Sequence, residues 1–480
     1  MNTGRKTSEI LFIVFLAILG LIPLIWPGDA PWINDEPRLI QIALDAHRTG
    51  DWPSHGLWGS RGFQYGPFPA WTYTAALYAV DDLIDLVRLK TFLTVVLTAA
   101  AIFWLARSIP FLNPWIGSVA FLSPYLWFYS RILWDNVFLI PLSALTVAAY
   151  VSFCVAARAW KLWIVALGMT CLFLTHLMSV AVIAPILIHA AVFYRVWLGQ
   201  HKRILLAQFA AATILSAGYL RHLLTTSPAA VSAHTQSIWR GWLFPFLGGE
   251  FFSAFGIDYF FGADWYVSGS PWVVFFGIFT WIAVGVTWMG MAEALRRIRD
   301  GIVSAAARDG SFHMSLLAVS ALGTQCILDG VCRTYGHPHY FNATWVFFLY
   351  CFWLALSLAN SPSAQAPLPI PMKLVYVASM GIVLGFLILN VHHSGGTRTV
   401  HYGAPIQNQI ELARILNTYY PDSKVVTDVA NYTYFPHALA VIRNFYGLAG
   451  TDTGPVRSLQ IRYQDPDGRS GWLTVQERSK

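Results

Sequence analysis

Long apolar runs recur along this chain and constrain its fold more than any other feature. Each run has about 16 to 23 residues, close to the roughly 20 that an α-helix needs to cross a bilayer. Hydrophobic residues make up 56% of the chain and charged residues 11%, whereas an average soluble domain has roughly 25% charged residues. We count eleven runs, at 10–26, 89–106, 112–127, 134–155, 162–178, 180–197, 204–221, 271–292, 312–329, 341–358 and 373–390. The sequence therefore predicts an all-α polytopic membrane protein with about eleven transmembrane helices.

Lysine and arginine give these spans an orientation, because they favour short cytoplasmic loops. Arg5 and Lys6 place the N-terminus in the cytoplasm. Eleven crossings then put the later basic residues near loops on that side: Arg107, Arg158, Lys161, Arg195, Lys202, Arg203, Arg296, Arg297, Arg299 and Lys373. The first run also has the basic start and apolar core of a signal peptide, but no small-residue cleavage site closes it. We expect a multi-pass protein of the inner or plasma membrane.

Three outward segments are too long to be simple connections: 27–88, 222–270 and the tail 392–480. Within the first, Glu36–Arg48 and Phe68–Val80 have helix-like patterns, and we expect both helices to lie along the membrane surface. Function should be sought on this side of the membrane.

The tail has a different character from the spans. It has ordinary charge content, a helix-like stretch at 407–417 and a strand-like stretch at 424–427. We predict a transmembrane domain at 1–391 and a small soluble, extracytoplasmic α/β domain at 392–480. The tail domain could be an acceptor-binding lid or a cap without chemistry.

Composition and motifs exclude several function classes. The net charge is +7, but the basic residues are scattered among apolar spans, so nucleic acid is not expected as a partner. The five cysteines have no metal-ligand spacing and are interpreted as free thiols. There is no Gly-rich phosphate loop, Gly-x-Ser-x-Gly elbow or His-Glu-x-x-His helix, so soluble nucleotides and hydrolase triads have no support.

An acidic pair, Asp35-Glu36, follows the first span directly and precedes Pro37. Charge at this place is costly unless it is solvated or paired. One interpretation is a helix start, with Asn34 or Asp35 as the cap, Pro37 in the first turn and Glu36 complementing the helix dipole. The other is an acid/base centre. The two are compatible, because a carboxylate fixed at a helix start is also held for proton transfer.

Arg131 and Asp135 stand four residues apart at the outer end of the fourth span. On a helix they would share a face and pair, which is either simple neutralisation of an interfacial arginine or a site in which Arg131 points at a phosphate. His176, at the outward end of the fifth span, indicates a cavity or a hydrogen-bonded histidine within the membrane.

A third polar group fills the outward link between the ninth and tenth spans. Its donors for a phosphate or sugar are Arg333, His337, His339 and Tyr340. Singly, each histidine is more typical of a wet interfacial side chain than of a ligand. Together with Arg131 they would form a positive rim opposite the carboxylates.

Taken in order, these landmarks resemble the GT-C superfamily of polyprenyl-phosphate-sugar glycosyltransferases, in particular the protein O-mannosyltransferase and aminoarabinose transferase-like branch. The matching segments are Asp35-Glu36, Ala46-His47-Arg48-Thr49-Gly50-Asp51-Trp52, Tyr65-Gly66-Pro67-Phe68-Pro69-Ala70-Trp71, Ser130-Arg131-Ile132-Leu133-Trp134-Asp135 and His337-Pro338-His339-Tyr340. The resemblance covers about 1–350. One departure is Gln64-Tyr65-Gly66-Pro67, where the aminoarabinose transferases have Lys-Pro-Pro, and this puts that sugar and its lipid A acceptor in doubt.

The resemblance implies an inverting glycosyltransferase that moves a hexosyl or pentosyl group from a polyprenyl-phosphate donor to an acceptor hydroxyl on a glycan, lipid or protein. Asp35 is the expected base and Glu36 its partner. The expected phosphate ligands are Arg131, Arg333, His337, His339 and Tyr340, and the expected substrate contacts are Tyr65, Asp135 and His176.

Two other function classes fit the same sequence. A transporter or flippase of a lipid-linked sugar would also need many spans, although transporter sites usually lie at the midplane. A ligase or polymerase of surface polysaccharide would differ in transferring a chain instead of one sugar. No cofactor is required by the sequence, and a divalent metal at Asp35, Glu36 and the histidines is possible.

Overall fold

The computed structural model describes residues 14, 18–32, 35–59, 62–226, 271–304, 308–332, 338–357, 370–394, 405–420, 423–427, 435–448, 457–464 and 472–477. Two expected phosphate ligands, Arg333 and His337, lie outside these residues, as does most of the loop 222–270.

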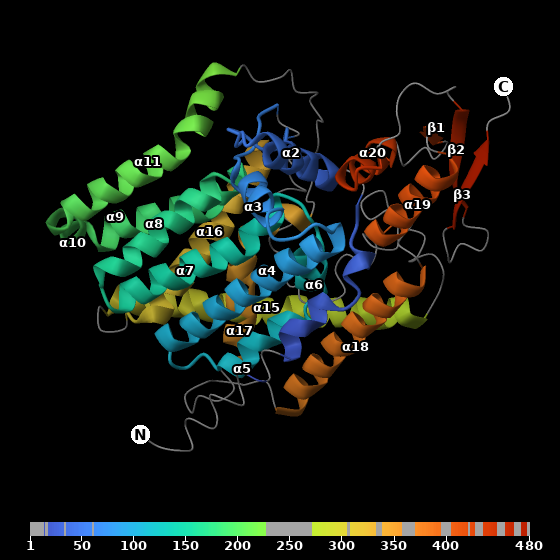
Figure 1. Cartoon of the computed structure of the whole chain (residues 1–480). Coiled ribbons are helices and arrows are strands. Elements are labelled where there is room, and N and C mark those ends of the chain that lie inside the picture. The colour runs from blue at the N-terminus through green and yellow to red at the C-terminus, as the bar shows by residue number, and fades with distance from the viewer. Residues whose placement is uncertain are drawn as a thin grey trace.

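Helices form most of the described chain (Figure 1). The α-helices of the first half are α2 (Asp35–Thr49), α3 (Phe68–Ala76), α4 (Leu83–Ser108), α5 (Pro114–Gly117), α6 (Pro124–Arg131), α7 (Leu139–Val155), α8 (Ala159–Phe173), α9 (Val180–Phe193), α10 (Arg195–Gln200) and α11 (Lys202–Thr225). Those of the second half are α15 (Pro271–Val303), α16 (Gly310–Cys332), α17 (Trp345–Ser357), α18 (Ile370–Ser394), α19 (Ile406–Tyr419) and α20 (Phe435–Phe445). Short 3-10 turns are η1 (Ile22–Leu24), η2 (Pro27–Asp29), η3 (Ser118–Leu122), η4 (Asn136–Phe138), η5 (Leu177–Ser179) and η8 (Pro338–Phe341).

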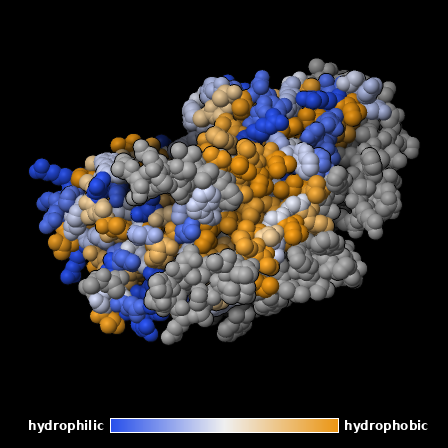
Figure 2. Space-filling view, turned by 90° about the horizontal axis from the view of Figure 1, so that it is seen from below, coloured by the Kyte–Doolittle hydropathy of each residue, from blue (hydrophilic) through white to orange (hydrophobic). Residues whose placement is uncertain are grey.

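Several of these helices suit a bilayer. Within the described residues, four helical stretches are long and apolar enough to cross a membrane: Leu83–Ser108, Asn136–Val155, Lys202–Thr225 and Gly310–Gly330. Shorter apolar helices accompany them at Ala159–Phe173, Leu177–Phe193, Trp345–Ser357 and Val377–Leu389. Figure 2 shows a hydrophobic band across the middle of one face, with hydrophilic surface to either side. The chain is an integral membrane protein by these criteria and by its fold, described below.

The bundle packs around α7 and α17. Helix α7 contacts α4, α8 and α16, and α17 contacts α15, α16 and α7. All thirteen residues of α17 are buried, so this helix is enclosed by protein. A helix that is apolar on every side is typical of such a position.

The span expected at 112–127 is not one continuous helix. The segment folds instead as α5, η3 and α6, with Pro114 and Pro124 at the starts of α5 and α6. Ser123 is extended (ψ 123°), since a residue before proline avoids the helical conformation. The prediction of one continuous helix from apolar content alone was therefore wrong for this segment.

The helices expected at Glu36–Arg48 and Phe68–Val80 are present as α2 and α3, and they pack on each other, while their place along the membrane surface stays a prediction. Helix α2 buries Leu39, Ile40 and Ala43. It ends at Gly50, whose φ of 79° is the left-handed conformation that glycine adopts after a helix at little cost.

The tail contains the expected helix and strand, as α19 and β1 (Ser423–Thr427), together with β2 (Arg457–Gln464) and β3 (Trp472–Glu477). The sheet order is β1-β2-β3, with β1 and β2 parallel and β2 and β3 antiparallel. In register, Val425 lies opposite Leu459, and Ile461 opposite Val475. That the tail forms a separate soluble domain stays a prediction.

Hydrogen bonds join tail helix α20 and the residue after it to the segment that follows the first apolar run. Helix α20 lies against α2 (Figure 1), and the Trp32 indole donates to the Ala438 carbonyl at 3.0 Å. The Arg48 guanidinium donates to the Asn444 side chain and carbonyl, both at 2.7 Å, and the Tyr446 hydroxyl donates to Asp82 at 2.9 Å. These bonds hold α2, and with it the acidic pair at its start, under the tail.

Candidate active site

The acidic pair occupies the first turn of α2, as the helix-start interpretation expects. The Asp35 side chain is 26% exposed, and its carboxylate lies 3.6 Å from the Arg38 guanidinium one turn later. Glu36 is buried, at 5% exposure. The helix dipole favours acidic groups at this position, which offsets part of the cost of burying them.

Asp135 brings a third carboxylate to the pair. It is 1% exposed and precedes η4, where its Oδ1 accepts a hydrogen bond from the Asn136 backbone N–H at 2.7 Å. Its Oδ2 has no hydrogen-bond partner among the described residues. Asp35 and Glu36 both repel it electrostatically, so acidic groups far apart in sequence converge here.

Burial raises the pKa of Asp35 above its ordinary value, and this effect outweighs the positive charge of Arg38 and a hydrogen bond from the Trp134 indole, which both lower it. A carboxylate whose pKa is raised toward the working pH is a stronger base than an ordinary aspartate. Of the pair, Asp35 is also the more exposed, and therefore the one that substrate can reach.

Trp134 is a functional candidate that the sequence reasoning missed. Its indole hydrogen-bonds Asp35, and its ring lies against that of His339, with centroids 4.7 Å apart. His339 in turn contacts the Tyr340 ring at 4.3 Å. Trp134 therefore joins the carboxylates to the late histidine link. In the sequence, only the position of Trp134 next to Asp135 indicated a functional role.

Tyr65 and His176 meet although 111 positions separate them. Their ring centroids are 3.9 Å apart. Tyr65 is held by backbone bonds to Leu57 and Gly56, at 2.8 and 2.7 Å. A Cβ on Gly66 would lie 2.0 Å from the Leu174 carbonyl oxygen, so only glycine permits the first loop to approach the end of α8 this closely.

Tyr65 lies close enough to the carboxylates to interact with them electrostatically. Burial is the main cause that raises its pKa, and nearby Asp135, Tyr340 and Asp35 add to it. The phenol therefore stays protonated and can donate a hydrogen bond. His176 accepts the Met178 backbone N–H at its Nδ1, at 3.1 Å, which leaves Nε2 as the ring's donor.

Tyr73 of α3 is a second residue that the sequence reasoning missed. It is 1% exposed, interacts with Asp135 and Glu36, and its hydroxyl has no hydrogen-bond partner among the described residues. It lines a cavity of about 120 Å³ between α3, α4 and α7. Buried polar atoms are nearly always bonded, so the free atoms of Tyr73 and Asp135 point to water or substrate.

Arg131 is not placed as the sequence predicted. Helix α6 ends at Arg131 and the chain is extended at Ile132, so Arg131 and Asp135 do not share a helix face. The Arg131 guanidinium instead donates to the Trp26 carbonyl and lies 4.6 Å above the Trp127 ring. Pairing at four-residue spacing needs a continuous helix, and η4 begins a new one.

Lys90 of α4 closes the end of α6. Its buried amine donates to the carbonyls of Tyr129 and Ser130, both at 2.9 Å. A hydrogen-bond donor at the C-terminus of a helix satisfies carbonyls that the helix leaves unpaired. Lys90 therefore fixes the segment from which Trp134 and Asp135 emerge.

The described part of this end of the molecule does not bring three metal-ligand groups close together, and His337 lies outside it. A divalent metal at the carboxylates stays a prediction.

Comparison with known proteins identifies the fold. No protein-family model matches the chain. Over 104 residues it is 31% identical to the undecaprenyl phosphate-alpha-4-amino-4-deoxy-L-arabinose arabinosyl transferase of Edwardsiella ictaluri (strain 93-146). That match covers 22% of this chain and only 18% of the relative.

Two solved structures match over nearly the whole chain. The crystal structure of ArnT from Cupriavidus metallidurans bound to undecaprenyl phosphate has a TM-score of 0.56 at 13% identity, covering 98% of both chains. The apo structure of the same protein has a TM-score of 0.53 at 11% identity, again covering 98% of both. The chain has the ArnT fold, and the resemblance to GT-C glycosyltransferases expected from the sequence is confirmed at that level.

Proposed function

We propose that this chain is an inverting glycosyltransferase that moves a sugar from a polyprenyl-phosphate donor to an acceptor hydroxyl at the outer membrane–water interface. The observation that carries the proposal is the convergence of Asp35, Glu36 and Asp135 in an ArnT fold. One ArnT structure was solved with undecaprenyl phosphate bound, which makes a lipid-linked donor the first choice.

Asp35 is the proposed general base. It takes the proton of the acceptor hydroxyl as that oxygen attacks the anomeric carbon from the side opposite the phosphate, so the configuration inverts. The bond from the anomeric carbon to the phosphate oxygen breaks, and polyprenyl phosphate leaves. General-base assistance of this kind contributes roughly 10²–10⁴-fold. Glu36 positions the acceptor, and the Trp134 indole fixes the orientation of the Asp35 carboxylate.

Cationic and hydrogen-bonding groups are needed where negative charge grows on the leaving phosphate. For this role we propose His339, which lies against Trp134, and Tyr340, which lies against His339, together with Arg333 and His337 of the same link. Arg131 is a further phosphate ligand in this proposal.

Tyr65, Asp135 and His176 are the proposed substrate contacts. The Tyr65 ring lies on the His176 ring, and we propose that a sugar packs against this pair, while the free Asp135 Oδ2 is an acceptor for a sugar hydroxyl. Because Gln64-Tyr65-Gly66-Pro67 stands where the aminoarabinose transferases have Lys-Pro-Pro, we propose a sugar other than aminoarabinose.

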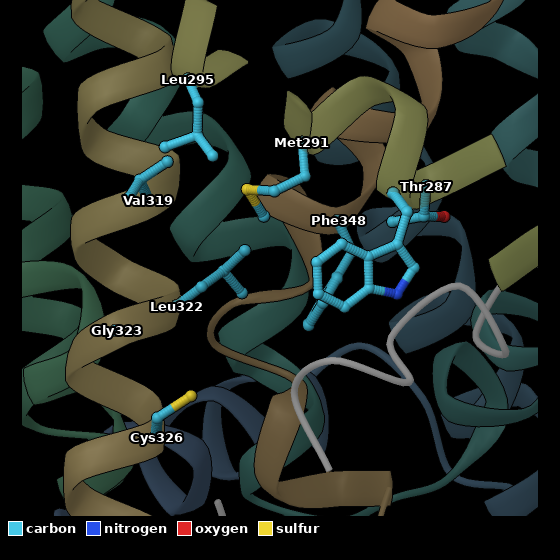
Figure 3. A pocket seen from close by; sticks show the side chains of 9 residues that line it. Thr287, Met291, Leu295, Val319, Leu322, Gly323, Cys326 and Phe348 are labelled. Atoms are coloured by element: carbon cyan, nitrogen blue, oxygen red, sulfur yellow. The ribbon is translucent and has the colours of Figure 1, made fainter. Parts of the chain in front are cut away.

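An apolar cavity suits the lipid part of the donor. It has a volume of about 250 Å³ and lies between α15, α16 and α17, lined by Trp288, Met291, Leu322 and Phe348 among others (Figure 3). Trp288 and Leu295 are 43% and 51% exposed, so the cavity reaches the surface of the bundle. An isoprenoid chain could enter it from the bilayer without passing through water.

The proposal includes eleven crossings, a cytoplasmic N-terminus and a C-terminal domain, 392–480, outside the membrane. The tail contacts α2 directly, which favours a role in holding the acceptor over a distant cap.

The test is substrate-dependent release of polyprenyl phosphate from purified, reconstituted protein, with the lipid that co-purifies identified by mass spectrometry. Release that accompanies glycosylation of an added acceptor supports a transferase. Movement of intact lipid-linked sugar across the vesicle membrane, without release of polyprenyl phosphate, would show a flippase instead. Transfer of a chain in one step would indicate a ligase or polymerase.

A further inference from the structure

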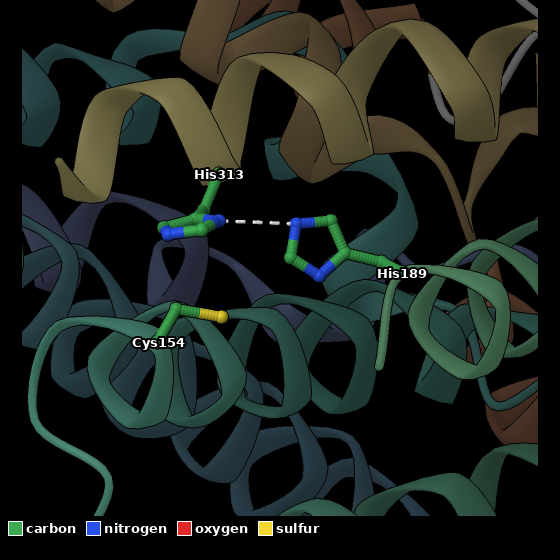
Figure 4. A group of neighbouring side chains, drawn as sticks. All are labelled: Cys154, His189 and His313. Atoms are coloured by element: carbon green, nitrogen blue, oxygen red, sulfur yellow. Dashed lines mark hydrogen bonds between the residues drawn. The ribbon is translucent and has the colours of Figure 1, made fainter. Parts of the chain in front are cut away.

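Three potential metal ligands meet inside the bundle, away from the carboxylates. Cys154 lies at the end of α7, His189 in the last turns of α9 and His313 in the first turn of α16 (Figure 4). One ligand atom from each lies within 4.8 Å of the other two, and His313 Nδ1 is 3.1 Å from His189 Nε2. Small shifts of these side chains would bring all three atoms to about 2.0–2.3 Å from one ion.

The remaining ring nitrogens are held by tyrosines. The Tyr150 hydroxyl is 2.9 Å from His189 Nδ1. The Tyr194 hydroxyl donates to the Cys154 carbonyl at 2.9 Å and lies 3.5 Å from His313 Nε2, from which it can accept. Histidines that bind metals usually donate their other ring N–H to such a partner, which fixes the tautomer and the ring orientation.

With both protons on the tyrosine-facing nitrogens, two lone pairs face each other at 3.1 Å beside the Cys154 sulfur. That arrangement is unfavourable by itself, and a cation between the nitrogens and the sulfur relieves it. The competing arrangement is a plain hydrogen bond, with one of the two facing nitrogens protonated. Only the first of these two protonation arrangements leaves both nitrogens able to bind a metal ion.

The cluster is buried but not sealed. His189 and His313 are 4% and 5% exposed, whereas Cys154 is half-buried. All three lie near helix ends that we predict to face the cytoplasm, beside Arg158 and Arg308. An ion can therefore reach the site from water past Cys154. At 1.5 Å per residue, α7 separates the cluster from Asp135 by roughly 25 Å.

We propose that Cys154, His189 and His313 form a binding site for a zinc-like transition-metal ion that joins α7, α9 and α16 at the end of the bundle opposite the carboxylates. One thiolate and two imidazoles suit zinc, whereas magnesium and calcium prefer oxygen ligands. Water completes the coordination from the Cys154 side. The site is independent of the proposed transferase function, and its role is to cross-link three helices.

The experiment uses full-length protein in detergent, loaded with zinc, passed through a desalting column, and analysed for bound metal by mass spectrometry. We expect one zinc per chain in the wild type and a loss of that equivalent in Cys154→Ser and in His189→Gln. Cys171→Ser is the matched control, because Cys171 is also a half-buried cysteine of a membrane helix but lies outside the cluster. It should keep the zinc.

Two measurements on unaltered protein avoid dependence on variants that fold poorly. Cobalt substitution should give a thiolate-to-cobalt charge-transfer band, and zinc should slow alkylation of Cys154 but not of Cys171. Equal zinc content in Cys154→Ser and wild type, with no thiolate band and no protection of Cys154, would overturn the proposal. Zinc held only at the outer carboxylates would give that result.

Discussion

The two ends of the bundle bury polar groups in opposite ways. At one end, Asp35 and Glu36 lie near Asp135 and repel it electrostatically, and Asp135 keeps an oxygen without a partner among the described residues. At the other end, His189 and His313 lie beside Cys154, and tyrosine hydroxyls hold the outward-facing nitrogens of both rings. The first arrangement is suited to moving protons and binding hydroxyls. The second is suited to holding a cation.

Substitutions at the two ends of the bundle should therefore have different effects on stability and activity. Repelling carboxylates are costly to the fold and are retained where chemistry needs them. A cluster of mutually bonded rings contributes to packing, so its loss should lower stability before activity. The predictions below test this contrast.

The largest effect is expected for Asp35→Asn, which should lower turnover by roughly 10²–10⁴-fold, because it removes the base. Since the pKa of Asp35 is raised in the folded protein, the ionised carboxylate is disfavoured by folding, and stability rises as pH falls through that pKa. Asparagine should therefore leave the Tm at neutral pH equal or higher. Turnover and Tm are measured together, with Asp45→Asn on the exposed face of α2 as the control. A turnover near wild type would remove Asp35 from the mechanism.

Asp135→Asn should follow, with a loss of roughly 10- to 100-fold in kcat/KM. The variant keeps the shape of the side chain but replaces one accepting carboxyl oxygen by an amide NH₂, and loss of a partner for a buried polar group costs about 1–3 kcal/mol. An unchanged kcat/KM would mean that the free oxygen of Asp135 faces water alone.

A smaller loss is expected for Tyr65→Leu, because it removes the ring that lies on His176. Aromatic pairs contribute about 0.5–1.5 kcal/mol, which corresponds to roughly 2- to 12-fold in KM. Tyr65→Phe keeps the ring and should retain most of the affinity. If both variants lose the same amount, the hydroxyl and not the ring binds substrate.

The smallest effect is a shift in pH dependence. Trp134→Phe removes the indole that lowers the pKa of Asp35, so the pKa should rise and activity should begin to fall at a higher pH as the solution is acidified. His189→Gln at the other end should leave the pH at which activity falls unchanged, while lowering Tm. Profiles of kcat against pH for the two variants check this, and a shift of equal size in both would show that the ends are coupled.

Much of this architecture follows from the sequence because it is local. The apolar runs predict α4, α7, α11 and α16, and the side-chain pattern of 36–48 predicts α2. The prediction of one continuous helix at 112–127 was wrong for an equally local reason, since its prolines divide the segment into short helices. Proline restricts the backbone at its own position, whatever the apolar content around it.

The residues of the candidate site were harder to predict from the sequence than the helices. Asp35, Tyr65, Asp135 and His176 were expected from the sequence, but Trp134 and Tyr73 were not, because a buried aromatic residue has no distinct signal in a chain with 15% aromatics. The interpretation of Arg131 and Asp135 as a helical pair was wrong, since it assumed a helix that ends between them.

That this chain belongs in a membrane follows from its amino-acid composition, because the cost of placing polar groups in lipid acts on every residue. Which polar side chains meet depends on the tertiary fold. The contact of Tyr65 with His176 and the meeting of Cys154, His189 and His313 depend on how separate helices pack. That packing is a property of whole surfaces, and no single segment of the sequence carries it.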